Sequence, residues 1–150
     1  MPEEIKKKVG VGVGVMVLRD SRILLGKRHA DPAKADSELH GESSWTMPGG
    51  KMDFGETPET TATRELKEET SLEATGLKVI CVSNDKVTDA HFVTIGLLCE
   101  DFTGEVQIME PDEITEWRWF DLNGLPEPIF FPSARVLRNY LDKTFYQSFN

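Results

Sequence analysis

GGKMDFGETPETTATRELKEETSL, residues 49–72, is the stretch that decides the fold of this 150-residue chain. Thr57 is a favourable N-cap, because its hydroxyl can accept a hydrogen bond from an amide in the first turn of a helix. Pro58 suits the first helical position, and neither Pro nor Gly follows until after Thr70. The stretch therefore predicts a helix over residues 58–70.

Three acids of this helix, Glu65, Glu68 and Glu69, fall three and four residues apart and so share one face. Each pair of like charges destabilises an isolated helix by a few tenths of a kcal/mol, and a bound cation relieves the repulsion. Carboxylate oxygens suit Mg²⁺, with Mn²⁺ as a substitute. A solvated acidic surface is the alternative interpretation. Upstream, residues 47–50 read Met-Pro-Gly-Gly, a turn whose backbone can approach a ligand closely.

In this register the stretch resembles the Nudix box, G-x5-E-x7-R-E-U-x-E-E-x-G-U, where U is an apolar residue. Eight of the nine specified positions agree, namely Gly50, Glu56, Arg64, Glu65, Leu66, Glu68, Glu69 and Leu72. Ser71 stands where the family has glycine. A side chain in the left-handed conformation costs roughly 1–2 kcal/mol, so the geometry at the end of the helix stays open.

Flanking segments extend the resemblance over roughly residues 9–141 to MutT-like nucleotide-triphosphate pyrophosphohydrolases. They are GVGVGVMV at 10–17, LLGKR at 24–28, MEP at 109–111, EWRWF at 116–120 and LPEPIFFP at 125–132. The resemblance implies an α/β fold, the Nudix α/β/α sandwich with a mixed β-sheet. It also implies Mg²⁺-dependent hydrolysis of nucleoside (deoxy)triphosphates, oxidised ones such as 8-oxo-dGTP among them, to a nucleoside monophosphate and pyrophosphate.

The same resemblance implies where the metal is held. The carbonyl of Gly49 and the carboxylates of Glu65 and Glu69 would bind the ion. Glu68 and Glu110 would be further ligands or supports.

Roles in catalysis follow partly from spacing. Arg64 lies four residues before Glu68, so it can pair with that acid and orient it. An ordinary surface ion pair is the alternative. A general base must reach the attacking water, and Glu65 and Glu110 are equal candidates, with Glu113 as a weaker substitute for Glu110.

Substrate contacts are expected from the two glycines Gly49 and Gly50 and from two further residues. Arg28, at the end of a strand, could clamp phosphates with its forked guanidinium, or could simply terminate that strand. Phe131 could stack on a nucleobase, as could Phe130 and Trp45, although a core position is the favoured interpretation for each.

The remaining chain predicts strands over Val9–Leu18, Arg22–Arg28, Leu77–Ser83, His91–Cys99 and Glu116–Phe120, and a C-terminal helix opening at Ser133. Turns are expected at residues 19–21 and 84–89, and Gly104 marks a second hairpin turn. Residues 30–44 form a long polar loop, either a mobile surface excursion or a substrate flap.

Composition fits one Nudix domain over residues 1–150, with 1–8 as a flexible N-terminus. A net charge of −9 argues against a nucleic-acid partner, and no apolar run is long enough to span a membrane. We expect a cytoplasmic protein whose partner is a small nucleotide substrate. Cys81 and Cys99, which lack a C-x-x-C spacing, should be reduced and buried. A homodimer is expected by analogy alone.

Two other functions remain open. Hydrolysis of ADP-ribose, nucleotide sugars or prenyl diphosphates is one, because the box recognises only the diphosphate. A catalytically silent module that binds nucleotides is the other, although such a module would more plausibly have lost one of the three helical acids.

Overall fold

The computed structural model describes residues 7–35 and 37–149, in which strands alternate with helices. Residues 1–6 of the N-terminus that was expected to be flexible lie outside this description. The elements are β1 (Val9–Arg19), β2 (Arg22–Arg28), β3 (Trp45–Thr46), β4 (Gly49–Lys51), α1 (Pro58–Thr70), β5 (Glu73–Val87), β6 (Ala90–Thr103), β7 (Ile114–Asp121) and α2 (Phe131–Asp142).

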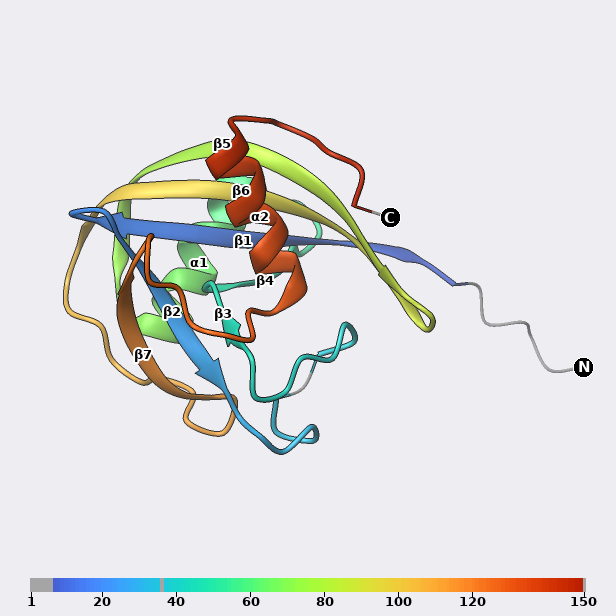
Figure 1. Cartoon of the computed structure of the whole chain (residues 1–150), viewed down its shortest axis with the longest axis horizontal. Coiled ribbons are helices and arrows are strands. Elements are labelled where there is room, and N and C mark those ends of the chain that lie inside the picture. The colour runs from blue at the N-terminus through green and yellow to red at the C-terminus, as the bar shows by residue number, and fades with distance from the viewer. Residues whose placement is uncertain (1–6, 36, 150) are drawn as a thin grey trace, which may run out of the picture.

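The strands form one seven-stranded mixed sheet in which β1 is the central member (Figure 1). It runs parallel to β6 and antiparallel to β2 and β4. On one side β5 pairs with β6, and on the other β3 and β7 pair with β2, all antiparallel. The mixed sheet predicted from the sequence is confirmed.

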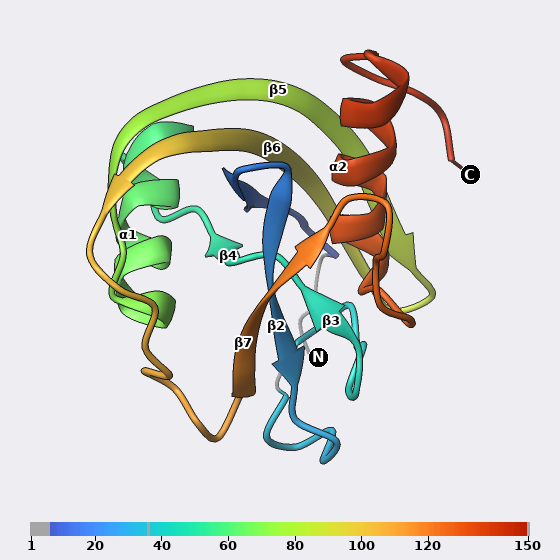
Figure 2. The ribbon, with the colours of Figure 1, turned by 60° about the vertical axis from the view of Figure 1, so that its left-hand side comes forward.

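Alternation along β1 divides the core in two, because successive side chains of a strand point to opposite faces of the sheet. Val13, Val15 and Val17 join the cluster that contains Leu66 of α1. Met16 and Leu18 join the cluster that contains α2 residues. The helices consequently lie on opposite sides of the sheet, as Figure 2 shows. This arrangement is the expected α/β/α sandwich.

Helix α1 begins and ends where the local sequence dictates. The hydroxyl of Thr57 accepts a hydrogen bond from the Thr60 amide at 3.1 Å, and Pro58 follows it in the first turn. Ser71 ends the helix in the left-handed conformation with φ = 71°, and its amide donates to the carbonyl of Lys67. Serine thus adopts the geometry for which the family has glycine.

The β5–β6 hairpin is longer than its sequence indicates. The segment 84–89 was expected to be a turn, yet β5 continues to Val87 and only residues 88–89 turn. Polar side chains continue the strand because they have partners there. Asp85 is buried and pairs at 2.8 Å with Arg135 of α2, and Ser83 donates a hydrogen bond to Asp85.

Two further boundaries differ from expectation. Gly104 does not turn a hairpin, because the strand that follows it, β7, pairs with β2 rather than with β6. Helix α2 begins at Phe131, so Ser133 lies within its first turn, where its hydroxyl accepts a hydrogen bond from the Met47 amide at 3.0 Å. The Met-Pro-Gly-Gly turn was also incomplete as a prediction, since its glycines already belong to β4.

Cys81 and Cys99 are free and buried, as predicted. Burial raises the pKa of each thiol to about 11.

Within residues 7–35 and 37–149, neither helix has the length and apolar character needed to cross a bilayer.

Candidate active site

The two glycines of β4 bring the backbone against the acidic face of α1. A Cβ on Gly50 would lie 2.5 Å from Cδ of Glu65 and 2.6 Å from its Oε1. A Cβ on Gly49 would collide with the carbonyl oxygen of Val13 in β1. The amide of Gly49 donates to Oε2 of Glu69 at 3.2 Å. Only glycine at both positions allows this approach, which explains why Gly49 and Gly50 occur together in β4.

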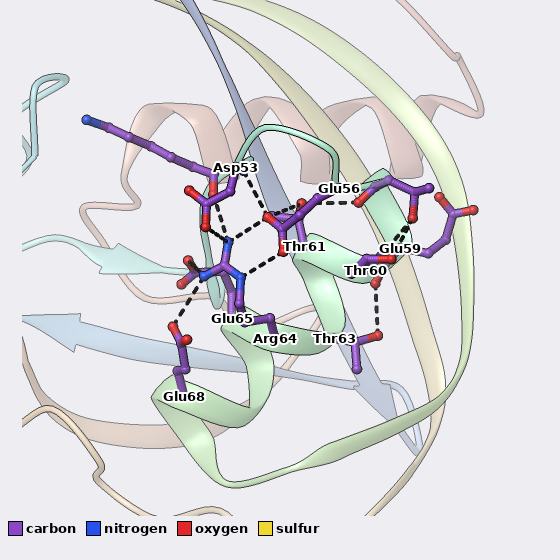
Figure 3. Close-up of polar contacts among 11 residues, drawn as sticks. Asp53, Glu56, Glu59, Thr60, Thr61, Thr63, Arg64, Glu65 and Glu68 are labelled. Atoms are coloured by element: carbon purple, nitrogen blue, oxygen red, sulfur yellow. Dashed lines mark hydrogen bonds and ion pairs between the residues drawn. The ribbon is translucent and has the colours of Figure 1, made fainter.

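Arg64 connects several acids around the start of α1 (Figure 3). It binds the carboxylate of Glu56 with two nitrogens, Nε at 2.9 Å and Nη2 at 2.8 Å. Its Nη1 donates to Glu65 at 2.8 Å and more weakly to Glu68 at 3.4 Å, while Nη2 also donates to the carbonyl of Lys51. The expected Arg64–Glu68 pair exists, but Glu56 and Glu65 are the closer partners.

The sequence analysis gave Glu56 no role. Its position in the box, eight residues before Arg64, was the available sign that the two residues could pair. Hydrogen bonds from Arg64 and from the Asp53 amide lower the pKa of Glu56 to about 2. The same contact raises the pKa of Arg64. This bidentate ion pair fastens the loop that precedes α1 to the helix.

Glu65 and Glu69 lie against each other beneath β4. Burial of its carboxyl group raises the pKa of Glu69 well above the ordinary value, the neighbouring charge of Glu65 raises it further, and the Gly49 amide opposes the shift. Glu69 is half-buried. Burial likewise raises the pKa of Glu65, against the lowering effect of Arg64.

Glu110 comes from the loop between β6 and β7 and faces the same acids. Burial raises its pKa, as do the negative charges of Glu113, Glu65 and Glu68. Its carbonyl accepts hydrogen bonds from the amides of Glu113 and Ile114, so a tight turn holds it in position. A residue 41 positions beyond Glu69 thus contributes to the helical acid cluster.

The donor set of this cluster fits a divalent cation. All its groups are carboxylate or carbonyl oxygens, which hard ions such as Mg²⁺ prefer. Adjacent, poorly hydrated carboxylates are stabilised by a proton or by a cation. Within the described residues, no three acidic, histidine or cysteine side chains already converge as a metal site. Arg64 donates a hydrogen bond to Glu65, and the Gly49 amide donates one to Glu69.

These acids line a cavity of about 610 Å³, a size typical of small-molecule sites. Its acidic residues are Glu38, Glu65, Glu68, Glu69, Glu110 and Glu113. Its large apolar residues are Val13, Leu39, Met47, Phe92, Ile114, Phe130 and Pro132. Gly49, Gly50 and Arg28 also line it, so the structure brings together most of the residues singled out from the sequence.

Arg28 lines the cavity and contacts the β2–β3 loop. Its Nε donates to the carbonyl of Gly41 at 3.0 Å and its Nη2 to that of Ala35 at 2.7 Å. Ala35 and Leu39 of this loop are buried in the cavity wall, so this part of the loop is not a surface excursion. Phosphate binding by Arg28 stays a prediction.

Phe131 is not among the residues that line the cavity, and its ring lies 4.9 Å from the guanidinium carbon of Arg135. Its neighbour Phe130 does line the cavity. Trp45 is buried in the core against Phe120. The aromatic surface available to a nucleobase is therefore that of Phe130 and Phe92.

The sequence and the structure of this chain are similar to those of known proteins. Residues 8–140 match the NUDIX domain family. A crystal structure of a MutT NUDIX hydrolase from Burkholderia pseudomallei aligns with a TM-score of 0.79 and 31% identity, over 88% of this chain and 98% of that one.

Curated relatives divide by substrate at similar identity. The 8-oxo-dGTP diphosphatase of Escherichia coli (strain K12) is 30% identical over 129 residues, 85% of this chain and 91% of the relative. The ADP-ribose pyrophosphatase of Methanocaldococcus jannaschii is 31% identical over 133 residues, 87% of this chain and 72% of the relative. The chain belongs to the Nudix family and is a Nudix pyrophosphohydrolase.

Proposed function

We propose that the protein hydrolyses nucleoside (deoxy)triphosphates, oxidised ones such as 8-oxo-dGTP among them, to a nucleoside monophosphate and pyrophosphate. One observation carries this proposal: the cavity that Glu65, Glu69 and Glu110 line also has an apolar and aromatic wall. A metal-bound triphosphate suits the acids, and a nucleobase suits the wall. The 8-oxo-dGTP diphosphatase of Escherichia coli (strain K12), 30% identical to this chain over 91% of its own length, supports the same substrate class.

Enzymes of this family typically need a divalent metal. Here Glu65 and Glu69 would hold it, with the Gly49 carbonyl, Glu68 and Glu110 as further ligands. When bound, Mg²⁺ or Mn²⁺ neutralises charge on the phosphate oxygens and makes water a better nucleophile. The net charge of −9 makes such mediation necessary, because acidic side chains alone would repel a triphosphate.

The chain's own residues would position the water and accept its proton. The water oxygen forms a bond to one phosphorus, the bond from that phosphorus to the bridging oxygen breaks, and pyrophosphate leaves. We assign the proton to the carboxylate of Glu110, which lines the same cavity and comes from outside the helix that supplies Glu65 and Glu69. Glu65 is the second candidate for the base.

Hydrolysis of ADP-ribose is the second candidate function. It is favoured by the ADP-ribose pyrophosphatase of M. jannaschii, which is 31% identical to this chain. Both reactions break a diphosphate bond, so the acid cluster serves either one, and the residues around the nonphosphate part of the substrate discriminate between them.

A substrate panel tests the proposal. Initial rates should be measured for nucleoside triphosphates, 8-oxo-dGTP, ADP-ribose and nucleotide sugars, each with Mg²⁺ and with a chelator. We expect the highest kcat/KM for a nucleoside triphosphate and loss of turnover with chelator. A higher kcat/KM for ADP-ribose would establish the second candidate. Turnover unaffected by chelator would contradict the metal assignment. Cytoplasmic location and homodimerisation stay predictions.

A further inference from the structure

We propose that Arg28 is a positioning residue that selects the nucleobase indirectly, by fixing the β2–β3 loop as a wall of the substrate cavity. This inference rests on the proposed function, because it concerns the nonphosphate part of a nucleoside triphosphate. It replaces direct phosphate binding as the main role of Arg28.

The guanidinium of Arg28 bridges two points of the loop. Its Nη2 donates to the carbonyl of Ala35 at 2.7 Å, and its Nε donates to the carbonyl of Gly41 at 3.0 Å. The Gly41 carbonyl also accepts hydrogen bonds from the hydroxyl and the amide of Ser44. Two diverging hydrogen bonds from one rigid planar group fix the distance between the two carbonyls.

The same guanidinium joins the loop to α2. Its central carbon lies 4.7 Å from the centre of the Phe130 ring, a stacking distance. Gly41 packs on that ring so closely that a Cβ there would collide with it. Gly41 also has φ = +96°, which disfavours any side chain. Arg28, Gly41 and Phe130 therefore form one packed unit.

This unit determines where the apolar wall lies. Leu39, 9% exposed, falls between Ala35 and Gly41 in the sequence. It lines the cavity together with Ala35 and Phe130. Phe130 precedes α2, whereas Glu65, Glu68 and Glu69 lie on α1 on the opposite side of the sheet (Figure 2). Because the phosphates would bind, through metal, at the acids of α1, the apolar wall is the part of the cavity left to contact the nucleobase.

An outer ion pair holds the same loop from the other side of the cavity. Lys51 of β4 contacts Glu38 at 2.8 Å, with both side chains more than half exposed. Such exposed pairs contribute little to stability. The partly buried contacts of Arg28 therefore restrain the wall more strongly than this exposed ion pair does.

The decisive variant is Arg28→Lys, which keeps the positive charge but cannot make both diverging hydrogen bonds. Leu39→Ala removes the wall side chain and leaves Arg28 untouched. Arg22→Lys is the matched control, because Arg22 begins the same strand and is 59% exposed beside Asp121. KM and kcat should be measured for dGTP and dCTP, together with the inhibition constant of imidodiphosphate, a base-free pyrophosphate analogue.

We expect Arg28→Lys to raise KM for the preferred base about tenfold more than for the other base, a size typical of a displaced apolar contact. The kcat values and the imidodiphosphate inhibition constant should stay within about twofold. Leu39→Ala should show the same loss of base selectivity, and the double variant should add little, because both changes act on one wall. Amide hydrogen exchange over residues 37–44 should accelerate in Arg28→Lys and not in Arg22→Lys.

Equal KM increases for both bases with weaker imidodiphosphate inhibition would show that Arg28 clamps phosphate, and would overturn the proposal. So would unchanged base selectivity in Leu39→Ala, a result that holds even if Arg28→Lys fails to fold. If the wild type hydrolysed no triphosphate, the proposed function would fail separately. Hydrogen exchange would then still decide whether Arg28 holds the loop.

Discussion

Gly50→Ala tests the site geometry with the smallest available change. The new Cβ would lie 2.5 Å from Cδ of Glu65, whereas carbon atoms pack at about 3.5–4.0 Å. The Glu65 carboxyl group must therefore retreat by about 1 Å or more. A misplacement of that size can reduce turnover about a hundredfold.

Stability should change much less than activity in Gly50→Ala. The opposing atoms belong to the end of a flexible side chain, which can rotate away, so we expect the free energy of unfolding to fall by no more than about 1 kcal/mol. Gly49→Ala is the contrasting case, because its Cβ would meet the backbone carbonyl of Val13, which cannot rotate away. We expect that variant to unfold at clearly lower denaturant concentration.

The assay combines kcat/KM for the best triphosphate substrate with urea unfolding of each variant. Gly124→Ala is the matched control, since nothing lies within 4 Å of a Cβ at that position. Wild-type turnover by Gly50→Ala would refute the assignment of Glu65 to the reaction. Global unfolding of Gly50→Ala at concentrations where the wild type is folded would refute the packing argument.

Three further expectations concern stability and reactivity. The folded-state pKa of Glu56, about 2 against an ordinary 4.5, stabilises the protein above pH 4.5, and this contribution is lost as the pH falls toward 2. Urea unfolding at several pH values should accordingly show a shallower acid dependence for Glu56→Gln, and an unchanged slope would contradict the ion pair. Ser71→Gly should raise the free energy of unfolding by about 1 kcal/mol, because it removes a side chain from φ = 71°; a destabilised variant would show that the serine is not strained. With pKa values of about 11 and no exposure, Cys81 and Cys99 should resist a thiol reagent at pH 8 until the protein is unfolded, and rapid labelling of the native protein would contradict their burial.

Local signals carried most of the sequence-based fold prediction. The helix over residues 58–70 is correct because its start is encoded by Thr57 and Pro58, which act on their immediate neighbours. The boundary errors all involve partners far along the chain. Asp85 extends a strand because Arg135 neutralises it 50 residues later.

Site residues could be predicted where a sequence motif fixes their spacing. They could not be predicted where a side chain contacts backbone atoms. The position of Glu110 beside the helical acids was expected, and Glu110 interacts electrostatically with Glu65 and Glu68. Arg28 was expected to face phosphate. Its contacts to the carbonyls of Ala35 and Gly41 have no signature in the sequence, because every residue offers a carbonyl.

The central claim is that the glutamates of α1 hold a divalent ion. The most direct measurement is a Mn²⁺ titration followed by electron paramagnetic resonance, with wild type, Glu69→Gln and Glu59→Gln. Glu59 is an exposed acid in the first turn of the same helix and serves as the matched control. We expect wild type and Glu59→Gln to bind Mn²⁺ equally and Glu69→Gln to bind it at least about tenfold more weakly. Equal binding by all three proteins would contradict the claim.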